Sequence, residues 1–269
     1  MASDAHAHPY YLAIQHPNCE IERKNFGGRC AASAFFRDEF LFNEKIAQQN
    51  DMPQTTLCFA IHPQLPATNI RLQNQKNTPN ILDESISFLE KCAMKKRIDC
   101  VGETGFDLYD KNFKNTEKIQ EDIFNKQIDI ALAYNLPVLL HIRRAMHKIF
   151  TYTKQLKNLP AVVFHSYSGS LEEAISILKR GINAYFSFSM IISRNHKNAM
   201  RCCANLDASR LLIETDAPYQ SGYEEKYSSY KNIYNVIAKA AELRGENIQT
   251  VEKVTDENFS AVFRKRGGM

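Results

Sequence analysis

Hydrophobic and polar positions follow two patterns that alternate along the chain. Short runs rich in apolar and β-branched residues predict strands, and the segments between them carry apolar residues at the helical period. The predicted strands are residues 3–8, 29–35, 56–62, 99–106, 136–142, 161–166, 182–188 and 210–215. The runs at 136–142, 161–166 and 210–215 are continuously apolar, which is typical of strands covered on both faces.

Helices are predicted between most of these strands. The helical pattern covers residues 37–49, 81–96, 117–134, 144–157, 171–179, 194–205 and 230–244, with a last helix near 257–265. The segment 10–28 is too irregular to predict as a helix. Residues 63–79 form an extended polar stretch, which we interpret as a loop.

The order of these elements predicts the fold class. Strands that alternate with helices form parallel sheets with crossover helices, and eight such strands in 269 residues fit a (β/α)8 TIM barrel. A doubly wound open sheet is the alternative, but no glycine-rich phosphate-binding turn follows the first strand. Because no linker or repeat is visible, we expect a single domain over residues 1–269.

The composition narrows the class of protein. With 44% hydrophobic and 24% charged residues it is typical of a globular domain, and the net charge of +4 permits a polyanionic substrate without requiring one. Seven cysteines without CxxC spacing predict reduced, buried thiols. Because no apolar run or secretory signal is present, we expect a cytoplasmic location, no membrane contact and no obligate protein partner.

The first predicted strand carries the first indication of chemistry, the sequence DAHAH at residues 4–8. Side chains two residues apart in a strand point to the same side, so His6 and His8 converge on one point. Converging imidazoles are typical of a metal site. A polar tail, or the remnant of a purification tag, is the alternative for an isolated pair.

Other predicted strands end in further ligand types. The catalytic end of a TIM barrel is the carboxyl end of its strands, and there lie His62, Glu103, His141, His165 and Asp216. One tetrahedral ion binds about four ligands. Together with His6 and His8 of the first strand, these residues offer more imidazoles and carboxylates than one such ion can bind. Two ions that share a bridging carboxylate accommodate them. The sequence therefore predicts a binuclear metal site.

Each of these residues, taken alone, could have an ordinary structural role instead of binding a metal. A single His141 or His165 after an apolar run is commonly a hydrogen-bonded core histidine. Glu103 could be a buried ion-pair partner, and Asp216, which precedes Ala-Pro, could be a turn former. Their joint placement at one end of a barrel favours the metal site.

Seven motifs resemble, in order, those of the TatD-like metal-dependent DNases of the amidohydrolase superfamily. Residues 4–8, 60–64, 102–107, 137–143, 165–169, 214–219 and 258–263 are similar to the family's DxHxH, GxHPH, GEIGLD, PxxxHxR, HCFSG, ETDAPY and NxxxxF. The departures are modest. Pro9 replaces a leucine, Gln64 a histidine and Ser166 a cysteine, and the segment 10–28 lacks the family's helical pattern.

The resemblance implies a metal-dependent deoxyribonuclease with a TIM-barrel fold. It implies one divalent ion held by His6, His8, Glu103 and Asp216, and a second held by Glu103, His141 and His165. The implied substrate is DNA, as single strands or frayed ends trimmed in the 3′–5′ direction. Zinc, manganese or magnesium would suit such ligands.

A mechanism follows from this arrangement. Two divalent ions activate a water and stabilise the attacking and leaving oxygens of a displacement at phosphorus. We predict that Asp216 is the general base, because it would be bound to one ion and face the attacking water. Glu103 is the second predicted catalytic residue, since it bridges the ions and sets their spacing.

Further residues are expected to contact the substrate: His62, Arg143, Ser168 and Tyr219. Arg143 lies two residues beyond His141 and could bind phosphate oxygens, with a rim salt bridge as the alternative. Ser168 precedes a predicted capping box at Ser170, where backbone donors could meet a phosphate.

Tyrosines just past the strand ends are candidates for base stacking. Tyr109 and Tyr167 share this placement with Tyr219.

Two alternative functions remain open from the sequence. The first is an amidohydrolase-type enzyme that acts on a lactone, an amide or an aminoacyl ester with the same metal site. The second is a non-catalytic nucleic-acid-binding barrel, against which the complete set of six predicted ligands argues.

Overall fold

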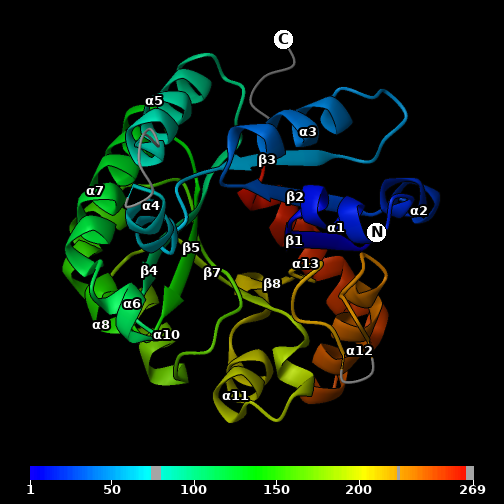
Figure 1. The fold of residues 1–269 in the computed structure, drawn as a ribbon. Coiled ribbons are helices and arrows are strands. Elements are labelled where there is room, and N and C mark those ends of the chain that lie inside the picture. The colour runs from blue at the N-terminus through cyan, green and yellow to red at the C-terminus, as the bar shows by residue number, and fades with distance from the viewer. Residues whose placement is uncertain (74–79, 223–224, 265–269) are drawn as a thin grey trace.

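The structure is a computed structural model that describes residues 1–73, 80–222 and 225–264. Its strands are β1 (Ser3–Ala7), β2 (Arg29–Ala34), β3 (Thr55–Phe59), β4 (Cys100–Asp107), β5 (Val138–Arg143), β6 (Val162–Phe164), β7 (Ala184–Phe188) and β8 (Leu211–Ile213). They form one eight-stranded parallel sheet in the order of the sequence. Figure 1 shows the helices arranged outside these strands.

The sheet returns on itself just beyond β8. The backbone N–H of Asp216 donates to the carbonyl of His6 at 2.9 Å, and the N–H of His8 donates to the carbonyl of Ala217 at 2.7 Å. Asp4 in β1 also accepts hydrogen bonds from the backbone and the hydroxyl of Thr215, at 2.9 and 2.6 Å. These bonds connect the last strand to the first, so the TIM-barrel prediction is confirmed.

The helices that follow the strands lie close to their predicted positions. They are α3 (Arg37–Ala47), α5 (Ile81–Met94), α7 (Glu117–Ala133), α10 (Leu171–Lys179), α11 (Lys197–Asn205) and α12 (Asn232–Arg244). Helix α10 begins at the predicted capping box, in which Ser170 accepts from the N–H of Glu173 and Glu173 accepts from the N–H of Ser170.

Helices also form in two segments for which the sequence pattern predicts none. Residues 10–28 hold α1 (Pro9–Gln15) and α2 (Cys19–Phe26), and the expected loop 63–79 holds α4 (Leu65–Gln73), while residues 74–79 lie outside the described part. Pro9 opens α1, where its fixed φ angle suits the first helical turn. Helices this short owe their stability mainly to packing against the rest of the protein, which a periodicity argument does not detect.

Two other helix predictions were wrong in detail. The segment 144–157 is divided into α8 (Met146–Ile149), η1 (Phe150–Tyr152) and α9 (Thr153–Leu156), with a short α6 (Lys111–Lys114) upstream of α7. The last helix, α13 (Ile248–Val262), begins well before residue 257. Its N-cap is Asn247, whose side chain accepts from the N–H of Thr250 at 2.7 Å. Two further 3₁₀ turns are η2 (Met190–Ser193) and η3 (Ala208–Arg210).

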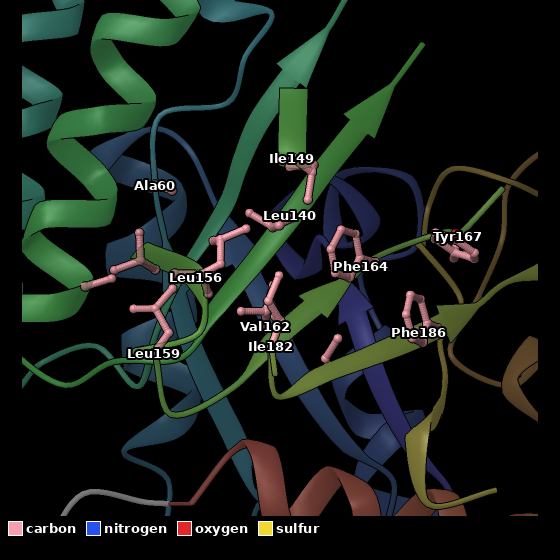
Figure 2. Close-up of a cluster of buried hydrophobic side chains, with 14 of the residues drawn as sticks. Ala60, Leu140, Ile149, Leu156, Leu159, Val162, Phe164, Tyr167, Ile182 and Phe186 are labelled. Carbon is pink, nitrogen blue, oxygen red and sulfur yellow. The ribbon is translucent and has the colours of Figure 1, made fainter. Parts of the chain in front are cut away.

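Alternate residues of the strands pack on opposite sides of the sheet. In β5, Val138 and Leu140 face the helices, whereas Leu139 joins the core inside the barrel. Figure 2 shows part of the outer layer, where Leu140, Phe164 and Phe186 pack together.

The interior core combines small side chains, among them Ala5, Ala31, Cys58 and Cys100, with larger ones, among them Leu139, Phe259 of α13 and Phe263 just after α13. All seven cysteines are free and buried, which confirms their prediction as reduced, packed thiols. Among the described helices, none has the length and apolar character that a membrane span requires.

Candidate metal centre

Glu103 lies at the centre of the candidate site. It belongs to β4, the residue is 3% exposed, and its two carboxylate oxygens face two different groups of side chains. The preceding Gly102 lets β4 lie close to β5, because a Cβ at this position would stand only 2.6 Å from Cβ of Leu139. The strand can therefore bring a carboxylate into the middle of the barrel mouth.

One group, the Oε2 group, comprises His6, His8 and Asp216. Nε2 of His6 lies 3.3 Å from Oε2 of Glu103 and 3.3 Å from Oδ1 of Asp216. Nε2 of His8 lies 3.8 and 3.5 Å from the same two oxygens. The two histidines face the same point because they are two residues apart at the end of β1.

The Oε1 group comprises His141 and His165. Nδ1 of His141 lies 2.6 Å and Nε2 of His165 lies 2.9 Å from Oε1 of Glu103, and the two ring nitrogens are 3.3 Å apart. These side chains come from the ends of neighbouring strands, β5 and β6. The structure thus brings all six predicted ligands to one place, with Glu103 between the two groups.

Hydrogen bonds on the far side of each ring orient three of the histidines. The second nitrogen of His165, Nδ1, is 3.2 Å from Oε1 of Glu214, and that of His141, Nε2, is 3.2 Å from Oδ2 of Asp107. Nδ1 of His6 is 2.9 Å from the hydroxyl of Ser33. A ring that donates its far N–H keeps a lone pair on the near nitrogen, which is the arrangement of metal-binding histidines.

His62 differs from these histidines in its tautomer. Its Nε2 is 3.3 Å from Oε1 of Glu103, so that His62, Glu103 and His141 also form a cluster of ligand types. Its Nδ1, however, accepts a hydrogen bond from the backbone N–H of Gln64 at 3.2 Å. A neutral ring that accepts at Nδ1 carries its proton at Nε2, so His62 offers a donor and no lone pair to the centre.

Without a cation, the histidines themselves carry the balancing charge. Burial lowers the pKa of His6, but the carboxylates of Glu103 and Asp216 outweigh burial and raise it to about 10. Burial raises the pKa of Glu103, yet the surrounding imidazoles hold it well below its ordinary value. Despite burial, Asp107 and Glu103 raise the pKa of His141, and Glu103 and Glu214 raise the pKa of His165. The site is therefore built for positive charge around a carboxylate.

The residues present fit a divalent cation. Nε2 of His6 is buried and has no hydrogen-bond partner among the described residues, although two carboxylate oxygens stand 3.3 Å away. A buried ring nitrogen is normally satisfied, and a cation held between these atoms would satisfy it. Imidazole nitrogens and carboxylate oxygens together suit zinc or manganese.

The centre lies at the base of a cavity with a volume of about 640 Å³. Its wall combines aromatic side chains, Phe35, Phe36 and Tyr219, with two guanidinium groups, Arg143 and Arg194. Such a combination suits a ligand that has both flat rings and negative charge.

The predicted substrate contacts are distributed around this cavity. Arg143, Ser168 and Tyr219 all line it, together with His62. Arg143 lies over the ring of Tyr109, with its guanidinium carbon 3.7 Å from the ring centroid. These residues are therefore placed where a substrate would contact them, and their roles stay predictions.

Tyr167 does not share this placement. It is 2% exposed, its hydroxyl donates to the carbonyl of Ser170 at 2.9 Å, and its ring packs on Phe164 and Phe186 (Figure 2). Its expected role in base stacking was wrong, because the side chain belongs to the core behind the site.

Several residues of the site were not singled out from the sequence. Asp107 and Glu214 lie within the quoted motifs, yet their function as hydrogen-bond partners of histidines was not foreseen. Their roles could have been inferred from the sequence, since metal-binding histidines commonly form a hydrogen bond with a carboxylate. Gln220 bonds to Asp216 at 2.6 Å, and no pattern in the sequence indicated this contact.

Comparison with known proteins agrees with this geometry. Residues 3–264 match the TatD related DNase family. The chain belongs to this family. An uncharacterized metal-dependent hydrolase of Methanocaldococcus jannaschii is 32% identical over 166 residues, which cover 62% of this chain and 63% of the relative.

A second relative is named for its activity. The 3'-5' ssDNA/RNA exonuclease TatD of Pectobacterium carotovorum is 34% identical over 176 residues, which cover 62% of this chain and 67% of the relative. The aligned part thus spans about two thirds of the length of these two relatives or slightly less.

Solved structures support the fold over almost the whole chain. The TatD homologue YjjV of Escherichia coli superposes with a TM-score of 0.79 at 23% identity and covers 97% of both chains. A TatD family hydrolase of Entamoeba histolytica superposes with a TM-score of 0.73 at 15% identity and covers 98% of both chains. The barrel fold is therefore shared over almost the whole chain.

Proposed function

We propose that this protein hydrolyses phosphodiester bonds at the 3′ ends of single-stranded nucleic acid with the help of two divalent cations. The observation that carries the proposal is the position of Glu103, whose two oxygens each face a separate group of imidazoles. The relatives named as ssDNA/RNA exonucleases support the substrate class.

His6, His8 and Asp216 would hold the first cation with Oε2 of Glu103. The Oε1 group would hold the second. Four imidazoles among the ligands favour zinc or manganese over magnesium, which prefers oxygen ligands and bound water. When bound, the two cations supply a water activated near neutral pH and stabilise the charge that develops at phosphorus.

Asp216 acts as the general base in this proposal. The residue is 7% exposed, and although burial raises its pKa, the imidazoles of His6 and His8 beside it hold the pKa far below its ordinary value. The side chain therefore stays ionised, so that it can orient an attacking water and accept its proton. Glu103 stays ionised for the same reason and keeps its two groups of histidines at a fixed spacing.

The remaining side chains of the cavity bind the substrate. The Nε2–H of His62 points toward the centre and is available to a non-bridging phosphate oxygen. Arg143, which has no carboxylate partner in the described ranges, offers a planar fork to the next phosphate. Tyr219 is 46% exposed beside His8, with ring centroids 5.2 Å apart, and presents a face to a terminal base.

End-labelled oligonucleotides test the proposal. Protein loaded with Mn²⁺ or Zn²⁺ is incubated with single-stranded DNA and RNA, with blunt duplex, and with ester and amide substrates. We expect stepwise shortening of single strands from the 3′ end, and slower attack on the duplex. Asp216→Asn should abolish turnover while oligonucleotide binding persists. Turnover of the ester or amide substrates alone would contradict the nuclease assignment, and unchanged turnover by Asp216→Asn would contradict the mechanism.

A further inference from the structure

Gln220 contacts the oxygen of Asp216 that does not face the histidines. Its Nε2–H donates to Oδ2 of Asp216 at 2.6 Å, whereas Oδ1 of the same carboxylate faces His6 and His8 at 3.3 and 3.5 Å. The two oxygens of Asp216 therefore have different partners. A hydrogen bond from a neutral amide to a carboxylate is among the stronger kinds, because the acceptor is ionised.

Two serines hold the Gln220 amide in place beside Asp216. Oε1 of Gln220 accepts from the hydroxyl of Ser189, at the end of β7, and from that of Ser166 at 3.3 Å, beyond β6. The hydroxyl of Ser166 also accepts from Nε2 at 2.9 Å. In the opposite orientation, an amide oxygen would stand 2.6 Å from an oxygen of the Asp216 carboxylate, and the two would repel. The network thus permits one orientation.

The backbone around Asp216 and Gln220 also adopts uncommon conformations. Ser166, Asp216 and Gln220 have φ angles of 43°, 55° and 52°, in the left-handed region that non-glycine residues seldom adopt. The carbonyl of Asp216 accepts from the N–H of Tyr219 at 2.7 Å, and its N–H donates to the carbonyl of His6 at 2.9 Å. Such costly conformations persist where the surrounding structure holds them, and they cluster at functional sites.

We propose that Gln220 is a positioning residue, which fixes the carboxylate of Asp216 so that Oδ1 faces the first cation while Oδ2 stays bonded to the amide. This inference rests on the proposed function, in which Asp216 is both a ligand and the general base. Without the amide, rotation about the Cβ–Cγ bond would exchange the two oxygens. A ligand that is already oriented loses less freedom when the cation binds.

Gln220→Leu tests the inference because leucine fills similar space and removes the amide. The metal-free, full-length protein is titrated with Mn²⁺ alone by calorimetry, and the loaded protein is assayed on a single-stranded oligonucleotide. We expect two quantities to fall about 10- to 100-fold: the Mn²⁺ affinity of the site that contains Asp216, and kcat. This is the usual range for losing the hydrogen-bond partner of a metal ligand. KM should change by less than about threefold, because substrate contacts are retained.

Two further variants make the test specific. Ser189→Ala keeps Gln220 but removes a hydroxyl that holds its amide, so we expect a smaller loss in the same two quantities. Gln54→Leu is the matched control: Gln54 donates to Thr56 at 3.3 Å and to the carbonyl of Phe263 at 3.1 Å, beside the start of β3 and away from the cavity. It should leave Mn²⁺ affinity and kcat unchanged.

The inference is overturned if Gln220→Leu retains wild-type Mn²⁺ affinity and kcat. It is also overturned if only KM rises, since Gln220 would then be a substrate contact. If Gln220→Leu fails to fold, Ser189→Ala decides in its place, and wild-type values for that variant overturn the inference. A wild-type protein that cleaves no oligonucleotide would refute the proposed function, while the Mn²⁺ titrations would still decide the role of Gln220.

Discussion

Nδ1 of His165 lies 3.2 Å from Oε1 of Glu214, and this carboxylate also accepts the backbone N–H of Ser166 at 2.8 Å. The Glu214 residue is fully buried, and His165 lines the cavity. The contact keeps the proton of His165 on Nδ1 and turns Nε2 toward Glu103, 2.9 Å away. One pair of side chains thus determines which ring nitrogen is available to a cation.

Replacing Glu214 should therefore weaken metal binding without removing a ligand. Glu214→Gln keeps the size of the side chain but loses the charge that favours the Nδ1–H tautomer. We expect the affinity for Zn²⁺ to fall about 10- to 100-fold, and activity to recover at high Zn²⁺ concentration. Competition with a chromogenic chelator measures the affinity. An affinity equal to that of the wild type would show that the pair contributes nothing to the site.

His62 and His165 should behave differently on substitution, although both lie within 3.3 Å of Oε1 of Glu103. His165→Ala removes a lone pair and should lower the metal content from about two ions per chain to about one. His62→Ala removes only a donor, so metal content should persist while kcat/KM falls about tenfold or more. Elemental analysis of the purified variants separates the two results. Loss of metal from His62→Ala would contradict the tautomer assigned to His62.

Metal binding should strengthen as pH rises. The pKa of His6 stands at about 10 in the metal-free chain, because the carboxylates of Glu103 and Asp216 outweigh the effect of burial. Below that pH a cation must displace the proton from the ring, so each displaced proton makes affinity rise about tenfold per pH unit. We expect tighter Mn²⁺ binding at about pH 8 than at about pH 6. Calorimetry in buffers of different ionisation enthalpy counts the released protons, and equal affinity at both pH values would refute the expectation.

Arg143 should contribute to substrate binding through charge. Arg143→Ala is expected to raise KM for a single-stranded oligonucleotide with little change in kcat. It should also weaken the dependence of KM on salt concentration, by the amount expected for about one phosphate contact. Arg180→Ala is the matched control, because Arg180 also lies over an aromatic ring, that of Phe150 at 5.0 Å, at the carboxyl end of α10. If both variants show the same KM, Arg143 forms no phosphate contact.

Tyr109 is expected to hold Arg143 in place. The guanidinium carbons of Arg143 and Arg144 lie 3.7 and 4.6 Å from the centroid of the Tyr109 ring. Tyr109→Phe keeps the ring face and should preserve KM, whereas Tyr109→Ser should raise KM toward the value of Arg143→Ala. Steady-state kinetics of the two variants decide between these outcomes. A rise in KM for Tyr109→Phe would instead assign the hydroxyl to substrate binding.

Much of the fold and of the ligand set was predictable because both depend on local periodicity. Alternation within β1 places His6 and His8 on one side, and parallel strands in chain order bring their carboxyl ends to one rim. Ligand types at those ends, such as Glu103 and Asp216, could therefore be assigned to one pocket before any distance was known. The strong motifs strengthened the same assignment.

Other features required the tertiary structure, because they depend on side chains that meet across strands. The sequence does not say that Nδ1 of His62 accepts a backbone N–H, and only this contact separates a donor from a ligand. Gln220 reaches Asp216 and Ser166 because three strand ends meet there. Helices α1 and α4 form on the barrel surface, where packing outweighs weak local patterns. The sequence alone determined the barrel and its ring of ligands; the three-dimensional packing decided which atom of each side chain faces the centre, since that choice depends on partners distant in sequence.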